Sequence, residues 1–439
     1  MARINSAAKI GLWTSTALVV GNMIGSGIFL LPATLAMYGA ISFIGWICSS
    51  IGAVALALLF SHLSKIFPNS SGGPYAYTRE GLGDFAAYLV AWGYWLSIWC
   101  TNAAIAVTFV SYLTVFIPAL SDNAYLSVGA GLITIWFLTW INTRGIRAAG
   151  RIQVITTVMK LTPLVMVAIV GVFYIDVGNF VPFNASGESA FSAITSTATL
   201  TLFAFLGLES ATVPSENIRD PEKTIPKATI IGTTLTIVVY ILGSVAVIGM
   251  LEPQQLKLSN APFADAAALI WGDQARNWVA LGAMVSTFGA LNGWILLQGQ
   301  IPLAAARDKL FPDIFKRENR KGIPAIGIVI SSVLISGLML MNFTKGLTDT
   351  FRFMILLSTV IVLVPYLFSA ASYGLILLQN KLWKSALITK VILAAVAFVY
   401  SMWAVMGSGQ ESVYWGFIGL MAGIPFYVWM KRKSTQDHE

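Results

Sequence analysis

The sequence has few of the residues that build disulfide frameworks, metal sites or soluble surfaces. Its 439 residues include two cysteines and two histidines, and only 10% of them are charged. Cys48 and Cys100 fall inside apolar segments, while His62 and His438 lie far apart. This pattern predicts no disulfide framework, no metal-ligand cluster and no cofactor. Low-complexity tracts are missing, and the first residues carry no small-residue cleavage site of a signal peptide.

The abundant residues are apolar. The chain is 57% hydrophobic with a mean hydropathy of +0.77, and apolar runs of membrane-spanning length fill most of it. We therefore expect an all-α polytopic membrane protein whose surroundings are a lipid bilayer. The net charge of +8 and the pI near 9.4 do not indicate nucleic acid, because the basic residues lie in short loops, where they set topology and contact anionic lipid.

Twelve apolar segments predict twelve transmembrane helices in one transmembrane domain, 1–439. Basic residues fall on alternate loops, with Arg144 and Arg147 after the fourth segment and Lys431 and Arg432 after the twelfth. The positive-inside rule then places both termini in the cytoplasm of a protein of the cytoplasmic membrane. The segments are 10–35, 41–66, 84–117, 125–142, 151–175, 190–213, 228–251, 276–303, 325–343, 351–379, 386–407 and 412–430.

Two connecting stretches are predicted to be non-helical. The stretch from Pro68 to Gly83 contains SSGGPYAY, and its glycines and proline indicate a re-entrant or interfacial turn at the cytoplasmic mouth. The stretch from Ser215 to Lys227, SENIRDPEKTIPK, has the prolines and mixed charges of a surface loop.

The first segment is interrupted at its centre. Gly25, Ser26 and Gly27 follow one another in GNMIGSGIFLLP, and each glycine costs about 1 kcal/mol of helix propensity relative to alanine. A break here would free backbone amides, which membranes tolerate only beside protein or a polar cavity, and the start of a new half-helix would attract a carboxylate. The alternative is a seam of small residues where two helices pack.

The sixth segment contains a second interruption. In FAFLGLESATVP, Gly207 lies in its interior and Pro214 at its end. Breaks in the first and sixth helices, five helices apart, are what an inverted repeat of five helices produces, with a substrate site near the midplane. We expect repeats over about 10–175 and 190–379, followed by two extra helices over 386–430. Two matched breaks are harder to explain by packing, so the pattern favours a transporter.

Two ionisable residues lie inside segments, where charge is costly and function is the default explanation. Glu209 follows the sixth-segment break, and a proton taken up there would suit a proton-linked gate or a pH sensor. The alternative is a static carboxylate that caps amides freed by the break. Lys160, in ITTVMKLTPLV, could occupy the place of a coupling sodium ion, or simply join the fifth helix to the first.

Polar and aromatic residues on other segments can complete a pocket. Asn102, Trp294, Ser358 and Tyr366 lie on the third, eighth and tenth segments. A tryptophan face can hold a cation, and an amide oxygen can accept its hydrogen bonds. Taken alone, a tryptophan such as Trp294 is more often an interface anchor or a core residue, so the set carries more weight than any one member.

Three stretches carry a family resemblance over essentially the whole chain. GSGIF in the first segment, SSGGPYAY in the following loop and FAFLGLESA in the sixth resemble the amino acid/polyamine/organocation (APC) transporter superfamily, and within it the basic amino acid/polyamine antiporters, above all those that exchange arginine for agmatine. The resemblance implies a LeuT-type 5+5 inverted repeat with broken helices 1 and 6 and two extra C-terminal helices. It also implies that substrate binding involves Met23, Ile24, Gly25, Ser26, Gly27, Ile98, Asn102, Phe203, Ala204, Leu206, Trp294 and Ser358.

The same resemblance implies roles in coupling and gating. Glu209 matches a proposed pH-sensing glutamate, and Tyr75, Phe203 and Tyr366 match aromatic gates. Two positions depart from the arginine/agmatine pattern: Phe203 replaces a tryptophan that covers the substrate, and Lys160 replaces a small apolar residue, as in proton-dependent members of the superfamily.

The expected function is therefore transport of amino acids rather than catalysis. We expect an antiporter that exchanges a cationic amino acid for a related amine or amino acid by alternating access. Its expected partners are protons, and two copies of the chain could form a homodimer. The alternative is a proton-coupled permease for neutral or broad-range amino acids. No convergent histidine, cysteine or carboxylate pair indicates an enzyme, and no repeated filter or charged ring indicates a channel.

Overall fold

The computed structural model describes residues 10–68, 72–144, 150–213, 215, 218–342, 345–379 and 386–436. In these ranges ten helical segments are long and apolar enough to cross a membrane. Two shorter apolar helices, Leu161–Tyr174 and Ala325–Met341, occupy the predicted fifth and ninth segments. Twelve helical segments thus lie where the sequence predicted them, and the prediction of an all-α polytopic membrane protein is confirmed.

The helices that form the bundle follow the predicted order. They are α1 Leu12–Met23, α2 Gly27–Leu35, α3 Ser42–Ile66, α4 Pro74–Leu113, α6 Ala124–Arg144, α7 Gly150–Gly171, α8 Ala190–Leu202, α9 Pro221–Met250, α12 Asp273–Arg307, α13 Ala325–Met341, α14 Leu347–Gln379, α15 Ala386–Met406, α16 Gly409–Met421 and α17 Gly423–Gln436. Shorter helices connect them, namely α5 Ala119–Asp122, α10 Pro253–Leu258 and α11 Pro262–Trp271.

The first and sixth segments are both broken, as predicted. The first stops being helical between α1 and α2, where Ile24 has φ −79° and ψ 82°. The sixth passes from α8 through a 3-10 turn, Phe203–Phe205, into irregular backbone in which Gly207 has φ 100°. Only glycine adopts such a φ at low energy, so Gly207 permits this bend. Residues 208–213, which follow it, contain no α-helix and include a second 3-10 turn, Ser210–Thr212.

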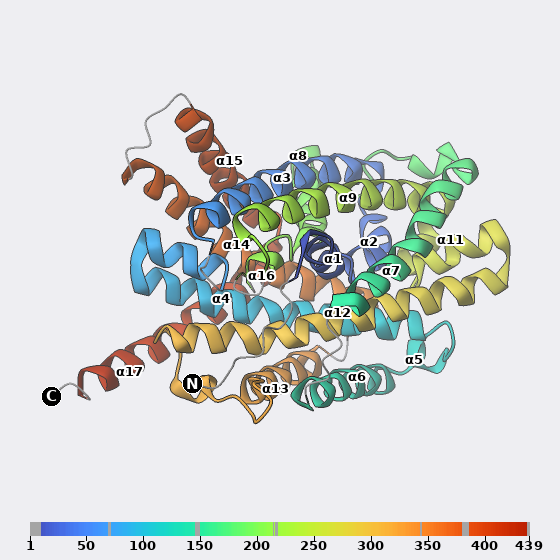
Figure 1. Cartoon of the computed structure of the whole chain (residues 1–439). Helices are drawn as coiled ribbons and strands as arrows, with labels where there is room; N and C mark the ends of the chain where they lie inside the picture. Colours follow the sequence, from blue (N-terminus) through green and yellow to red (C-terminus); the bar gives the residue numbers. More distant parts are fainter. Residues whose placement is uncertain are drawn as a thin grey trace.

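Equivalent helices of the two halves pack in equivalent ways. Helix α1 packs on α7 and α9, and α8 packs on the counterparts of these helices, α14 and α3. Helices α3 and α9, α4 and α12, and α6 and α13 also pack as matched pairs. Figure 1 shows α1 enclosed between the α3 and α9 layer and the long helices α4 and α12. This reciprocal pattern is that of the LeuT-type inverted repeat.

Burial separates the central helices from the peripheral ones. The most apolar window of α1 and α2 is 94% buried, whereas the corresponding windows of the last two spans are only 22% and 17% buried. The broken first segment is therefore the core of the bundle, and Figure 1 shows α15 and α17 at its periphery.

Two stretches predicted as loops are partly helical. Helix α4 begins at Pro74 and is bent at Gly83, where φ is 81°, so that residues 74–82 form a separate helical piece. Helix α9 begins at Pro221, inside the predicted surface loop. Both helices start with proline, whose fixed φ and missing N–H suit the first helical turn. Helices α10 and α11 were not predicted at all.

Candidate functional site

The start of α2 presents unpaired backbone donors at the core of the bundle. The N–H groups of Ser26, Gly27 and Ile28 find no acceptor among the described residues, although all three residues are buried. Helix α2 has no side-chain cap, so its first turn keeps its orphan donors and the positive end of its dipole. Such a terminus can bind a carboxylate directly through its amides.

The end of α1 presents carbonyl oxygens that are held by side chains of other helices. The indole Nε1 of Trp294, on α12, donates to the Asn22 oxygen at 3.2 Å, and the Tyr240 hydroxyl, on α9, donates to the Met23 oxygen at 2.6 Å. Tyr240 was not predicted as a site residue. A tyrosine in the middle of an apolar span, VVYILG, was the available signal, because a buried hydroxyl there must find a partner.

Trp294 touches both breaks. Besides its bond to Asn22, its ring lies 3.2 Å from the position that a Cβ on Gly207 would occupy. A side chain at residue 207 would therefore displace the indole or the end of α1. The tryptophan joins the two broken segments, so the interpretations of Trp294 as an anchor and as a site residue are compatible in this geometry.

The glycines of the first break also form a tight seam. A Cβ on Gly27 would lie 2.9 Å from both Cα and Cβ of Ala204, and one on Gly25 would lie 3.1 Å from Cβ of Ala290. Carbon atoms normally approach no closer than about 3.5 Å. The small residues therefore lie at a helix break and in a closely packed seam at the same time, and the binding of a carboxylate there stays a prediction.

A second polar cluster lies along α4. Asn102 donates from Nδ2 to Oε1 of Gln298 at 2.7 Å, while its own Oδ1 is buried and has no partner among the described residues. One residue earlier, the Thr101 hydroxyl bonds to that of Ser358 at 2.7 Å, and Ser358 donates to the Ser97 oxygen. The structure thus places the predicted residue Ser358 against Thr101, the neighbour of Asn102 in the sequence of α4.

Glu209 lies in a clamp of two tyrosines. The hydroxyl of Tyr94, on α4, donates to its Oε1 at 2.7 Å, and that of Tyr366, on α14, donates to its Oε2 at 2.8 Å. The Glu209 side chain is fully buried. Each carboxylate oxygen is therefore bonded to a phenol group, and the backbone N–H groups of Gly207 and Glu209 also interact with the carboxylate. Tyr94 was missed by the sequence analysis, although it is a polar residue inside the third segment.

The predicted gate residues lie at different levels of the bundle. Phe203 meets Phe351 edge to face, with ring centroids 6.1 Å apart. The Tyr75 hydroxyl donates to Oδ2 of Asp308, which follows α12, at 3.0 Å. Arg79 lies 3.6 Å from the same carboxylate, so Tyr75 belongs to a polar cluster at that helix end.

The remaining predicted site residues are buried in the same core. Met23, Ile24, Ile98, Ala204 and Leu206 are each at most 4% exposed. Lys160 lies on α7, and its side chain lies outside the described part of the chain.

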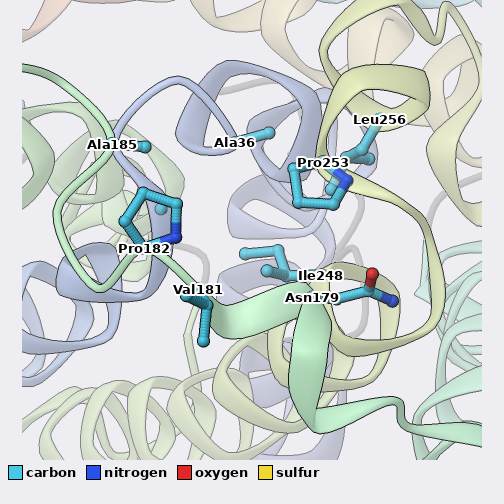
Figure 2. Close-up of a pocket in the computed structure, with 9 residues that line it drawn as sticks. Ala36, Asn179, Val181, Pro182, Ala185, Ile248, Pro253 and Leu256 are labelled. Carbon is cyan, nitrogen blue, oxygen red and sulfur yellow. The ribbon is translucent and has the colours of Figure 1, made fainter.

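A pocket lies away from these residues. It is lined by Ala36, Gly39, Asn179, Val181, Pro182, Ala185, Ile248, Pro253 and Leu256. Figure 2 shows Pro182 and Val181 on one side of it and Pro253 and Leu256 on the other. None of the predicted substrate residues is among those that line it.

Comparison with known proteins agrees with this architecture. The family model described as "Amino acid permease" matches residues 10–428. The chain is 33% identical to a cadaverine/lysine antiporter of Escherichia coli (strain K12), covering 99% of this chain and 98% of that protein. It is 31% identical to an arginine/ornithine antiporter of Pseudomonas aeruginosa (92% and 87% covered) and 31% identical to the putrescine transporter PotE of Haemophilus influenzae (97% and 98% covered).

A solved structure supports the fold independently. The manganese transporter of Eremococcus coleocola, in complex with an aromatic bis-isothiourea compound, superposes with a TM-score of 0.60 at 11% identity, and 98% of each chain is covered. At that identity the likeness concerns the fold alone. The family match over nearly the whole chain, together with the broken first and sixth helices, shows that this protein belongs to the amino acid/polyamine/organocation transporter superfamily and, within it, to the basic amino acid/polyamine antiporters.

Proposed function

We propose that the chain exchanges a cationic amino acid for a related amine or amino acid across the cytoplasmic membrane by alternating access. The observation that carries the proposal is the set of buried, unpaired N–H groups at Ser26, Gly27 and Ile28. A free amino acid has a carboxylate that these amides can bind. The relatives named for cadaverine and lysine, for arginine and ornithine and for putrescine favour a cationic side chain.

The substrate would span the two breaks. Its carboxylate would bind the amides of Ser26 and Gly27, and its α-amine would approach carbonyls near Met23 and the sixth-segment break. The face of Trp294 and the free oxygen of Asn102 would meet the cationic end, because an aromatic face and an amide oxygen both attract cations. Ser358, which is bonded to Thr101 on the same helix as Asn102, would complete this end.

Coupling and gating would involve residues around this core. Glu209 would take up and release the coupled proton within its tyrosine clamp, and Lys160 remains the second candidate for this role. Phe203, with Phe351, would cover one side of the substrate, while Tyr75 and Tyr366 would move when the site opens.

We also propose an arrangement in the membrane. The alternating basic loops support cytoplasmic N- and C-termini. The reciprocal packing supports one transport domain with repeats over 10–175 and 190–379 and peripheral helices over 386–430. Those peripheral helices expose apolar side chains that lipid, or a second copy of the chain, would cover.

A thermal-shift screen tests the substrate class. Purified protein is heated with each of the twenty amino acids and with their decarboxylated amines, because a ligand that binds only the folded state raises the melting temperature. Strong protection by lysine, arginine or their amines, and none by alanine or leucine, is the expected result. The opposite ranking would contradict a cationic substrate.

The alternative is a proton-coupled permease for neutral amino acids. The apolar pair Phe203 and Phe351 favours it, because phenylalanine attracts cations less than tryptophan does and lacks an indole donor. Counterflow in liposomes separates the two functions. Uptake that requires a substrate inside the vesicle indicates exchange, whereas uptake that needs only a pH gradient indicates the permease.

A further inference from the structure

Gln298 connects three helices through its side-chain amide. It lies on α12 and is fully buried. Its Nε2 donates to the Ile328 oxygen at 3.0 Å and to the Ser332 hydroxyl at 2.9 Å, both on α13. Its Oε1 accepts from Nδ2 of Asn102, on α4, at 2.7 Å.

These partners determine which end of each amide is the donor. The Ile328 carbonyl can only accept, so the atom of Gln298 that faces it must be the NH₂ group. The other end of Gln298 is then the oxygen, which can only accept. The atom of Asn102 that faces this oxygen must therefore be its NH₂ group.

One consequence is a free oxygen at Asn102. With its NH₂ group bonded to Gln298, the side chain presents Oδ1, which is buried and has no donor among the described residues. A buried acceptor without a partner is destabilising and rare in native proteins. A ligand that carries N–H groups would satisfy it.

This oxygen belongs to the region of the first break. Ile105 lies three residues after Asn102 on α4 and therefore on the same face. Its side chain lies 3.8 Å from the position that a Cβ on Gly25 would occupy. Trp294, four residues before Gln298 on α12, bonds to the end of α1. The bonded pair of Asn102 and Gln298 therefore lies one helical turn from the groups that contact the break.

We propose that Gln298 is a specificity-determining positioning residue, which holds Asn102 with its oxygen toward the substrate and so selects side chains that end in an N–H donor. The proposal rests on the proposed function and adds a residue that does not itself bind the substrate. A turned Asn102 would present its NH₂ group and repel an ammonium or guanidinium donor. The bond from Gln298, itself anchored at Ile328, prevents that turn.

The test compares lysine with norleucine, which is lysine without its terminal ammonium group. Thermal-shift titration of the purified full chain gives the affinity for each ligand in the wild type and in Gln298→Met, which keeps the length of the side chain and removes its amide. Gln300→Met is the matched control, because Gln300 is only partly buried on the same helix and has no hydrogen bond to a described residue.

The wild type should prefer lysine, and Gln298→Met should reduce the ratio of the two affinities roughly tenfold, since one hydrogen bond to a charged group is weakened. Norleucine binding should stay unchanged, which also reports that the variant is folded. Gln300→Met should keep the wild-type ratio. In Asn102→Leu, which lacks the selecting oxygen, adding Gln298→Met should have no further effect on the ratio.

Two results would overturn the proposal in distinguishable ways. If the wild type prefers lysine and Gln298→Met keeps that preference, or loses both ligands equally, Gln298 does not determine specificity and the proposed function still stands. If the wild type binds no cationic amino acid or amine, the proposed function fails, and the role of Gln298 fails with it.

Discussion

Replacing Gly27 by alanine should separate the two broken segments and stop transport. The added Cβ would lie 2.9 Å from Cα and Cβ of Ala204, and one of these atoms belongs to the backbone. Carbon atoms pack at about 3.5 Å or more, so the start of α2 and the 3-10 turn must move apart by roughly 0.6 Å. Overpacking of this kind costs about 1 to 3 kcal/mol. That energy lowers the population of the conformation in which α2 packs on Ala204 roughly 5- to 150-fold.

Counterflow of radiolabelled lysine into proteoliposomes measures the effect, with thermal unfolding as a measure of stability. Gly129→Ala is the matched control, because Gly129 is a helical glycine at which a Cβ would meet nothing within 4 Å. The control should transport normally and be slightly stabilised, since alanine favours helix over glycine by about 1 kcal/mol. In Gly27→Ala, a second change, Ala204→Gly, removes one of the two clashing atoms and should restore part of the transport.

The reasoning fails if Gly27→Ala transports at the wild-type rate. In that case the close approach of α2 to Ala204 would not belong to a conformation of the transport cycle. Equal loss of transport in Gly129→Ala would also contradict it, because any glycine substitution would then have the same effect.

Three further predictions concern the side chains around the breaks. Glu209→Gln should flatten the pH dependence of transport and leave substrate binding largely intact, since the amide can still bond to both tyrosines; an unchanged pH profile would remove Glu209 from the proton role. Trp294→Phe should weaken lysine binding about tenfold, because it removes the indole hydrogen bond to the Asn22 backbone oxygen and reduces the cation–π attraction. Isothermal titration measures the lysine affinity, and an unchanged affinity would show that the indole is dispensable. Tyr240→Phe should lower the free energy of unfolding by about 1 kcal/mol, as the Met23 oxygen loses its hydroxyl donor, and equal denaturation midpoints would disprove this.

The sequence predicted those structural features whose physical cause lies in the residues themselves and their neighbours along the chain. Apolar runs identify membrane helices because lipid accepts only segments whose backbone is bonded internally. Glycines at 25, 27 and 207 identify the breaks because they weaken a helix regardless of its neighbours. Glu209 stood out because a carboxylate is costly inside an apolar segment. The fold class and both broken helices were therefore predictable.

The sequence was less informative about helix ends and connections. The prolines at 74 and 221 begin helices inside stretches whose composition resembles loops. Proline favours both a turn and the first residue of a helix, so composition alone does not choose between them. Packing of the following residues against the bundle decided it.

Only the tertiary structure decided which groups meet. Glu209 is bonded to Tyr94 and Tyr366, which are 115 and 157 residues away, and Gln298 orients Asn102 across 196 residues. A hydrogen bond extends over about 3 Å, so its partner depends on how separate helices pack rather than on spacing along the chain. The sequence by itself determined that this chain crosses the membrane with two interrupted helices. The packing of those helices determined which donors and acceptors surround the break and which remain free for a substrate.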